Sequence, residues 1–123
     1  MFYLIDCPKI ISREDWNARS PKAQPARLPS PVPYAVIHHG GTKVYCTNQN
    51  SCADIVRSYQ NHHMDGEGWN DIGYNFVVGE DGNVYEGRGW DAVGLHALGY
   101  NGKSIGICII GDFTGLSVAQ RCV

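Results

Sequence analysis

The segment of the chain that decides the fold is Tyr74-Asn75-Phe76-Val77-Val78-Gly79-Glu80-Asp81-Gly82-Asn83-Val84-Tyr85-Glu86. Its β-branched and aromatic residues stand on both sides of an Asp-Gly pair, and this arrangement is a strong signal for a tight turn between two strands. We therefore predict a β-hairpin with one strand over residues 74–79 and the returning strand over residues 84–86.

Two further apolar runs predict strands on either side of this hairpin in the sequence. Residues 34–38 (Tyr-Ala-Val-Ile-His) follow a proline and stand just before Gly40-Gly41, which predicts a buried strand that ends in two histidines. Residues 104–110 (Ser-Ile-Gly-Ile-Cys-Ile-Ile) predict another apolar strand, with Cys108 as a small core residue.

One helix is clearly marked between these strands. Side chains recur there at the spacing of one helix face: Ile55, Val56, Tyr59 and His63. Ser51 can cap the start of this helix, which should stop before Gly66. Strands on both sides of a helix predict an α/β fold with a mixed β-sheet flanked by helices. Little pattern remains after Thr114, although such a layer calls for at least one more covering helix.

The N-terminal part of the chain is rich in proline, with five of the six prolines between residues 12 and 33. Proline fixes φ and removes a backbone donor, so this part should be largely irregular. Trp16 and Leu28 have apolar surface to bury, which favours an ordered arm over a disordered linker. We expect residues 1–33 to form an arm packed on a single domain of residues 34–123.

Composition narrows the class of protein. A chain of 123 residues suits one domain, and no stretch is apolar enough to span a bilayer. The ten Lys and Arg residues are scattered and the formal charge is -2, so the sequence predicts no basic patch that would bind a polyanion. We expect no nucleic-acid partner and no transmembrane segment.

Cysteine usage points to an oxidising compartment. Five cysteines is a high count for a reduced cytosolic protein of this size, which favours secretion. The apolar start, Met1 to Ile5, is too short for a signal peptide, so no export signal stands in this sequence. Because five is odd, at least one thiol stays free or pairs outside the set.

His38-His39 and Tyr74 are the first candidates for chemistry. Histidines at the end of a strand can hold a metal ion, but zinc needs further ligands, and a structural pair is the common alternative. The hydroxyl of Tyr74 should lie near the rim of the sheet, where it could donate to a developing oxyanion. A half-buried core tyrosine explains the same pattern, so both interpretations stay open.

Other side chains could line a groove. His63 fits the inner face of the helix, and His96 lies in a loop. Trp69 and Trp90 each follow a glycine and are expected to be loop aromatics, which suit packing against a sugar or peptide. Arg88 stands between two glycines and could reach a carboxylate, although a solvated surface arginine is the common alternative.

In chain order, these signals closely resemble the peptidoglycan recognition protein family, from about residue 11 to residue 113. The resemblance is carried by Val36-Ile37-His38-His39, Cys46 and Cys52, residues 68–76, residues 79–90, Ser104-Ile105-Gly106-Ile107 and Ile110-Gly111-Asp112-Phe113. It implies a mixed sheet flanked by helices, related to the bacteriophage lysozyme-like amidases, with a muropeptide groove on one face.

The resemblance also implies roles for individual residues. In the enzymes of the family, a zinc-bound water attacks the bond between N-acetylmuramic acid and L-alanine. His38 matches the first zinc-ligand histidine, Tyr74 the catalytic tyrosine, and Cys46 and Cys52 the small disulfide. Cys7 resembles an N-terminal cysteine that is tied to a later helix in some members, with Cys122 as a poorly aligned partner. Six residues are expected to contact the muropeptide: His39, His63, Gly68, Trp69, Arg88 and His96.

The chain departs from the enzymes of the family in two respects. They complete the Zn²⁺ site with a histidine and a cysteine after a long C-terminal helix, and neither motif occurs before Val123, so the fold is expected to lack its last helical segment. Gly40 also stands where the family has a hydroxyl residue, next to the second histidine. We therefore expect a recognition protein, with a zinc-dependent amidase as the alternative, and self-association through exposed sheet surface.

The type of peptidoglycan follows from two features of the same resemblance. In the family, a Gly-Trp pair such as Gly68-Trp69 accompanies diaminopimelate-type peptidoglycan, and Arg88 resembles the arginine that pairs with the diaminopimelate carboxylate. A guanidinium fork suits that carboxylate physically. We expect a secreted innate-immune protein that prefers diaminopimelate-type over lysine-type stems.

Overall fold

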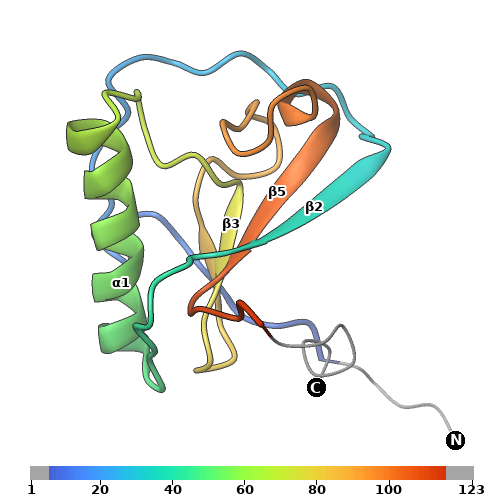
Figure 1. Cartoon of the computed structure of the whole chain (residues 1–123). Helices are drawn as coiled ribbons and strands as arrows, with labels where there is room; N and C mark the ends of the chain where they lie inside the picture. Colours follow the sequence, from blue (N-terminus) through green and yellow to red (C-terminus); the bar gives the residue numbers. More distant parts are fainter. Residues whose placement is uncertain (1–5, 116–123) are drawn as a thin grey trace, which may run out of the picture.

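The predicted hairpin forms the middle of a five-stranded sheet in the computed structural model, which describes residues 6–115 (Figure 1). Within that range the elements, in chain order, are β1 (Ile10–Ile11), β2 (Tyr34–His39), α1 (Gln49–Asn61), the π-helical turn η1 (His62–Gly66), β3 (Phe76–Val78), β4 (Val84–Glu86), the 3₁₀ turn η2 (Asn101–Lys103) and β5 (Ser104–Ile109).

The sheet is mixed, as predicted, with the strand order β1-β4-β3-β5-β2. β3 and β4 pair antiparallel, and the other neighbouring strands pair parallel. β3 begins at Phe76, later than predicted, because the backbone of Tyr74 and Asn75 bonds elsewhere. Their carbonyls accept from the N–H groups of Arg88 and Gly87, at 3.0 and 2.8 Å.

β2 is an edge strand, and the prediction that it is buried was wrong. Within residues 6–115 it pairs with β5 alone, and most of its side chains are exposed. Ile37 shows the effect most clearly, because 60% of its surface is accessible. Apolar composition alone does not distinguish a central strand from an edge strand. Self-association through this surface stays a prediction.

Helix α1 forms where the apolar spacing predicts it, but its cap is Asn48, not Ser51. The Oδ1 atom of Asn48 accepts the backbone N–H of Ser51 at 2.9 Å, so the helix begins before Ser51. An asparagine oxygen satisfies one of the unpaired N–H groups at a helix start as well as a serine does. The chain then continues through η1 to Gly66.

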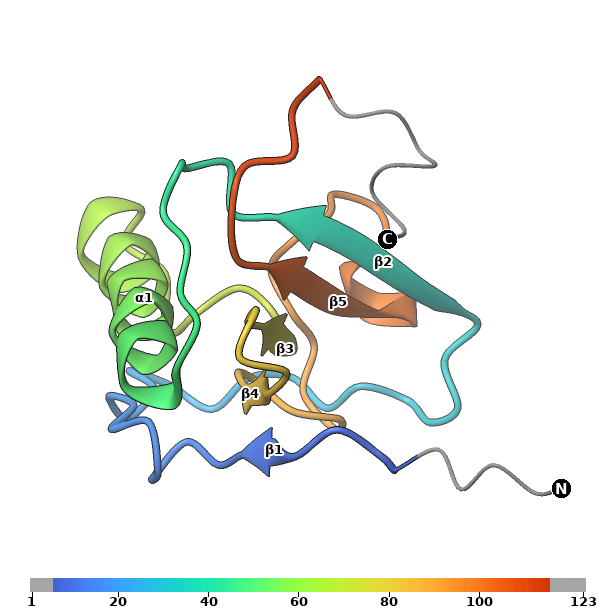
Figure 2. The same cartoon turned by 90° about the horizontal axis from the view of Figure 1, so that it is seen from below.

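Each face of the sheet has its own core, and Figure 2 shows α1 to one side of the sheet. On one face, Val77, Tyr85 and Cys108 pack against α1 and Trp16. On the other face, Phe76 and Ile105 pack against Leu28, a fully buried residue from a different part of the arm. The N-terminal arm therefore closes both layers, and β1 within it pairs with β4. Its division from the domain at residue 33 stays a prediction.

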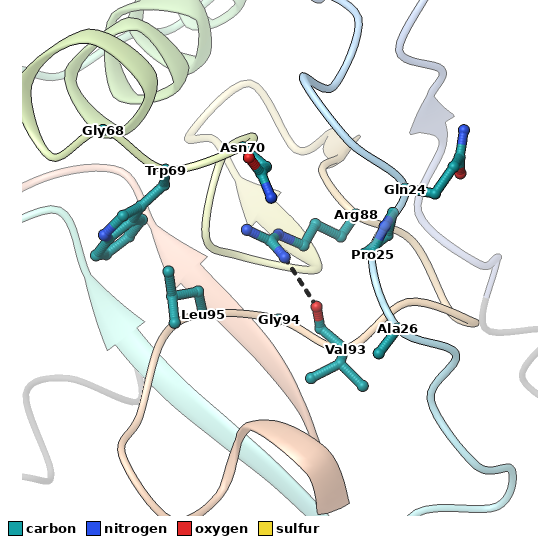
Figure 3. A pocket seen from close by; sticks show the side chains of 10 residues that line it. All are labelled: Gln24, Pro25, Ala26, Gly68, Trp69, Asn70, Arg88, Val93, Gly94 and Leu95. Carbon is teal, nitrogen blue, oxygen red and sulfur yellow. Dashed lines mark hydrogen bonds between the residues drawn. The ribbon is translucent and has the colours of Figure 1, made fainter.

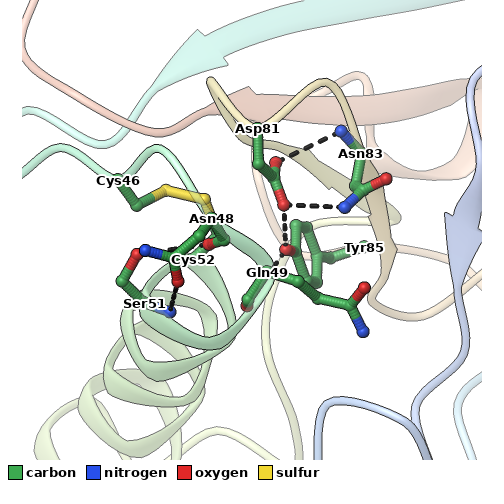
Figure 4. Close-up of a disulfide and its surroundings, with 8 residues drawn as sticks. All are labelled: Cys46, Asn48, Gln49, Ser51, Cys52, Asp81, Asn83 and Tyr85. Carbon is green, nitrogen blue, oxygen red and sulfur yellow. Dashed lines mark hydrogen bonds between the residues drawn. A yellow bond between two sulfur atoms is a disulfide. The ribbon is translucent and has the colours of Figure 1, made fainter.

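The predicted disulfide between Cys46 and Cys52 is present and lies beside a turn network (Figure 4). Asp81 accepts the Tyr85 hydroxyl and the Asn83 side-chain amide, and the same hydroxyl lies 3.3 Å from the carbonyl oxygen of Gln49. The hairpin turn is thereby tied to the start of α1.

The other cysteines agree in part with the sequence. Cys108 is buried in the core, as predicted, and Cys7 is exposed. Cys122 lies outside the described residues, so its pairing with Cys7 stays a prediction. None of the helices within residues 6–115 is long and apolar enough to cross a membrane.

We predict that Trp16→Ala lowers the free energy of unfolding by about 3–5 kcal/mol, as expected for truncating a buried tryptophan. Trp16 is fully buried, and its indole N–H donates to the carbonyl of Glu86 at 2.9 Å. Urea denaturation measures the change. Trp90→Ala is the matched control and should cost far less, because Trp90 is 62% exposed. Equal effects of the two substitutions would show that the arm is not part of the core.

Candidate functional site

Aromatic rings from four parts of the chain form a continuous row across the face of the sheet that carries α1. We call this set the ring row; its members are His96, His38, Tyr74, His63 and Trp69. The centroids of successive rings lie 5.0, 5.6, 5.5 and 4.6 Å apart. The structure thus brings together residues from separate parts of the chain, from His38 to His96.

Strand register decides which of the two neighbouring histidines joins the ring row. His38 is paired with Cys108, whose side chain belongs to the core on the α1 face. Successive side chains of a strand point to opposite faces, so His39 points away from the row. Its Nδ1 atom accepts the backbone N–H of Phe113 at 3.0 Å. His39, which the sequence predicted to contact a ligand, therefore does not lie beside the other site residues.

His96 enters the ring row from the loop before η2. Its imidazole lies flat over β5, where a Cβ on Gly106 would come within 2.4 Å of the ring. A glycine is required there because any side chain would displace the imidazole. The Nδ1 atom of His96 lies 2.9 Å from the Nε2 atom of His38, and this contact links the loop to β2.

His63 is held as a neutral imidazole with a fixed tautomer. Its Nδ1 atom accepts the backbone N–H of Gly73 at 3.0 Å, which leaves its proton on Nε2. Burial, followed by the nearby charge of His62, lowers the pKa of His63 to about 4. The side chain packs against Trp69, with the two rings tilted by 33°. At neutral pH it can therefore offer one N–H donor.

Tyr74 is a protonated phenol at any ordinary pH. Burial, with the neighbouring Cys108 thiol, raises the pKa of Tyr74 far above its usual value. Burial also raises the pKa of Cys108 to about 12, so that thiol stays protonated too. Tyr74 can donate a hydrogen bond but cannot act as a base or a ready anionic ligand.

A cavity of about 410 Å³ opens beside the Trp69 end of the ring row (Figure 3). Its walls come from residues 24–26 of the arm, Gly68-Trp69-Asn70 and residues 93–95, and Arg88 also lines it. Gly68, Trp69 and Arg88, which the sequence predicted to contact one ligand, therefore share this cavity.

Arg88 is fixed by two backbone carbonyls. Its Nε donates to Ile72 O at 2.7 Å and its Nη1 donates to Val93 O at 3.0 Å. A guanidinium has five N–H groups, so three remain for a ligand. Burial lowers the pKa of Arg88, but an arginine keeps its charge in proteins. No ion pair of Arg88 forms among the described residues, because Asp71 pairs with Arg13 instead.

The described residues do not fit a zinc site. Zinc in proteins takes three or four ligands from histidine, cysteine or carboxylate side chains. Within residues 6–115 no three such side chains lie together. His38 has one imidazole neighbour, His96, at 2.9 Å between the two ring nitrogens. Two imidazoles alone form too small a donor set for firm binding.

Several residues that build the site were missed by the sequence reasoning. Asn75 and Ser104 stand within the predicted strands, and residues 24–26 lie in the irregular arm, far in sequence from the other residues of the cavity. Asn75 is fully buried, and its side chain bonds three backbone groups. A polar residue between a tyrosine and an apolar run was the available signal, because a buried amide must be hydrogen-bonded.

The fold and the site define a class of protein: an amidase-like α/β domain in which a row of neutral rings ends at a cavity lined by an arginine. Residues 28–122 match the family model described as N-acetylmuramoyl-L-alanine amidase. The chain is 47% identical over 104 residues to peptidoglycan-recognition protein SC2 of Drosophila melanogaster, covering 85% of this chain and 55% of that protein.

Solved structures agree with these comparisons. Bumblebee PGRP-SA is 43% identical, with a TM-score of 0.83 over 94% of this chain and 70% of that one. Peptidoglycan recognition protein-LE, in complex with tracheal cytotoxin (monomeric diaminopimelic acid-type peptidoglycan), is 48% identical, with a TM-score of 0.80, and the match covers 83% of this chain and 59% of that one.

The chain belongs to the peptidoglycan recognition proteins of the N-acetylmuramoyl-L-alanine amidase family. The fold and family expected from the sequence are thus confirmed. The chain spans about half the length of the curated relative that it matches, at 55%.

We predict that the stability of the fold falls as the pH drops from about 6.5 to about 4, in part because of His63. Its pKa is lowered to about 4 on folding, so the unfolded chain binds more protons than the folded chain in this window. The loss should be about 1–2 kcal/mol, allowing for solvent screening of a half-buried group.

His63→Asn provides the test by urea denaturation between pH 4 and pH 7. The asparagine oxygen can still accept the Gly73 N–H, but the side chain does not titrate. Its stability should therefore depend less steeply on pH than that of the wild type. Parallel pH curves would show that His63 does not carry the effect.

Proposed function

We propose that this chain binds muropeptides of bacterial peptidoglycan, with a preference for the diaminopimelate type. The observation that carries the proposal is the half-buried Arg88, which lines the cavity with three uncommitted N–H groups and no carboxylate partner among the described residues. A buried charge needs a counter-charge, and a ligand carboxylate supplies it.

We propose that the ring row, which continues from this cavity, forms a groove across the sheet. Its rings offer flat apolar faces that suit packing against a sugar or a peptide stem. His63 and Tyr74 each keep a proton at neutral pH and can donate it to carbonyl oxygens of a stem peptide. We assign Gly68 and Trp69 to the wall of the diaminopimelate pocket and His63, His96 and Tyr74 to contacts along the stem.

A ligand of the same kind occurs among the relatives. The structure of peptidoglycan recognition protein-LE holds monomeric diaminopimelic acid-type peptidoglycan. The likeness to that complex supports the same ligand class for this chain. It also supports a role in innate immunity, which we propose for the whole protein.

Hydrolysis of the ligand is the second candidate function. The amidase family model favours it, as does the placement of Tyr74 with its ring 5.6 Å from that of His38. Zinc would supply the attacking water, and His38 would be one of its ligands. Residues 6–115 do not supply the remaining donors, so we derive no step through the metal and rank binding first.

We propose an extracellular location. Cys46 and Cys52 form a disulfide. Disulfides persist in oxidising compartments and are rare in cytosolic proteins. Bacterial wall fragments would meet a recognition protein in the same compartment.

We predict that Arg88→Lys weakens binding of monomeric diaminopimelate-type muropeptide by about 10- to 100-fold, because lysine keeps the charge but loses the fork that holds a carboxylate. Isothermal titration calorimetry measures the change. Arg19→Lys is the matched control, since Arg19 pairs with Asp65 on the exposed surface.

Binding of lysine-type muropeptide shows whether Arg88→Lys affects the guanidinium contact alone or weakens binding in general. This muropeptide lacks the diaminopimelate side-chain carboxylate, so its affinity should change little in Arg88→Lys. An equal loss for both ligands would contradict the assignment of Arg88 to that carboxylate.

We predict that muropeptide binding survives treatment with EDTA, because the proposed contacts come from protein side chains alone. Zinc content of the purified chain and release of stem peptide from peptidoglycan are measured alongside, with His38→Ala as the control. Stoichiometric zinc and release that depends on His38 would instead establish the amidase. Binding without zinc or release would establish the recognition role.

A further inference from the structure

A line of polar contacts runs from the start of η2 through Ser104 of β5 to the two histidines of the ring row, His96 and His38. The Ser104 hydroxyl donates to the carbonyl of Tyr100 at 2.7 Å. The same oxygen lies 3.3 Å from Nε2 of His96. On the other side of that ring, Nδ1 of His96 lies 2.9 Å from Nε2 of His38. These contacts connect a buried serine to the histidine of β2.

The direction of each hydrogen bond follows from counting protons. A carbonyl oxygen only accepts, so the single Ser104 proton is used toward Tyr100. The Ser104 oxygen can then only accept from His96, which places the His96 proton on Nε2. A neutral imidazole carries one ring proton, so Nδ1 of His96 is an acceptor. The proton between the two imidazoles therefore belongs to Nε2 of His38.

The surroundings keep both imidazoles in this arrangement. At pH 7.5 a free imidazole is mostly neutral, so each ring carries a single proton. The Asn101 side-chain oxygen accepts the backbone N–H groups of His96 and Ala97, at 2.8 and 2.9 Å. Gly106 leaves room for the His96 ring, as described above. The loop and the strand thus fix the ring that Ser104 orients.

We infer that Ser104 is a positioning residue of the groove, which acts through His96 to keep the His38 proton on Nε2 and the His38 lone pair on Nδ1. A ligand group that meets Nδ1 of His38 must then donate a hydrogen bond, as an amide N–H or a sugar hydroxyl does. The inference deepens the proposed function and rests on it for the binding readout only.

The tautomers are measured first, by the imidazole ¹⁵N chemical shifts of the whole chain at pH 7.5. In the wild type, His38 and His96 should each show a protonated Nε2 and an unprotonated Nδ1. In Ser104→Ala, His96 loses its acceptor, and both residues should shift toward a mixture of tautomers. An Nδ1-protonated His38 in the wild type, or unchanged shifts in Ser104→Ala, would overturn the inference.

Two variants control for a loss of structure. Ser104→Thr keeps the hydroxyl and should restore the wild-type shifts. Ser58→Ala removes another serine hydroxyl that donates to a carbonyl, that of Ile55 at 2.6 Å, and should leave both histidines as in the wild type. Should Ser104→Ala fail to fold, the wild-type and Ser104→Thr spectra still decide the tautomer assignment.

Binding of monomeric diaminopimelate-type muropeptide tests the consequence for the groove. Ser104→Ala should bind about threefold to tenfold more weakly, as expected for one mismatched hydrogen bond, and Ser104→Thr should bind as the wild type does. Altered tautomers with unchanged affinity would overturn the role in the groove. A wild type that binds no muropeptide would refute the proposed function, whereas the tautomer measurement would still test Ser104.

Discussion

The side chain of Asn75 is the constraint on which the site depends. Its amide nitrogen donates to the carbonyls of Gly89 and Ala92, and its oxygen accepts the N–H of Gly106. A buried amide that is left unpaired costs about 1–3 kcal/mol, so these bonds fix the relative positions of the segments that they join. The loop that carries Arg88, the start of β3 and the strand beneath His96 are thereby held as one unit. The ring row and the cationic cavity can keep their spacing only because this amide is satisfied.

Charge is distributed unevenly over that unit, and the distribution determines what the groove can bind. Asp71 is buried, but it accepts from Arg13, Gln60 and its neighbouring backbone N–H, so its charge is compensated within the fold. Arg88 has no such partner among the described residues. The histidines of the ring row whose pKa values are lowered are neutral at physiological pH and add no charge of their own. An uncharged ring row with one arginine near its end favours an elongated, mostly neutral ligand that bears a carboxylate at one end.

The sequence was informative where a local pattern has one physical explanation. The Asp-Gly turn between two β-branched runs predicted the β3–β4 hairpin, and the spacing of Ile55, Val56 and Tyr59 predicted α1. Predictions from the sequence failed where contacts with residues distant in the sequence determine the local structure. The apolar run of β2 does not reveal that, in the described part of the chain, a single strand pairs with it. The choice between Asn48 and Ser51 as the helix cap depends on backbone geometry. The contact of His96 with His38 joins residues of separate segments, so no local pattern could predict it.

The His38–His96 contact decides which nitrogen of His38 is available to a ligand. A metal-binding imidazole must turn an unprotonated nitrogen toward the ion, and its tautomer is set by the partner of its other nitrogen. In this chain the Nε2 atom of His38 faces His96 at 2.9 Å and carries the proton of that contact. Coordination through Nε2 would require that proton to leave and the His96 contact to break. Nδ1 of His38 keeps its lone pair in this arrangement, so the same histidine pair that steadies the groove for a ligand leaves metal coordination at Nδ1 to depend on further ligands beyond the two imidazoles.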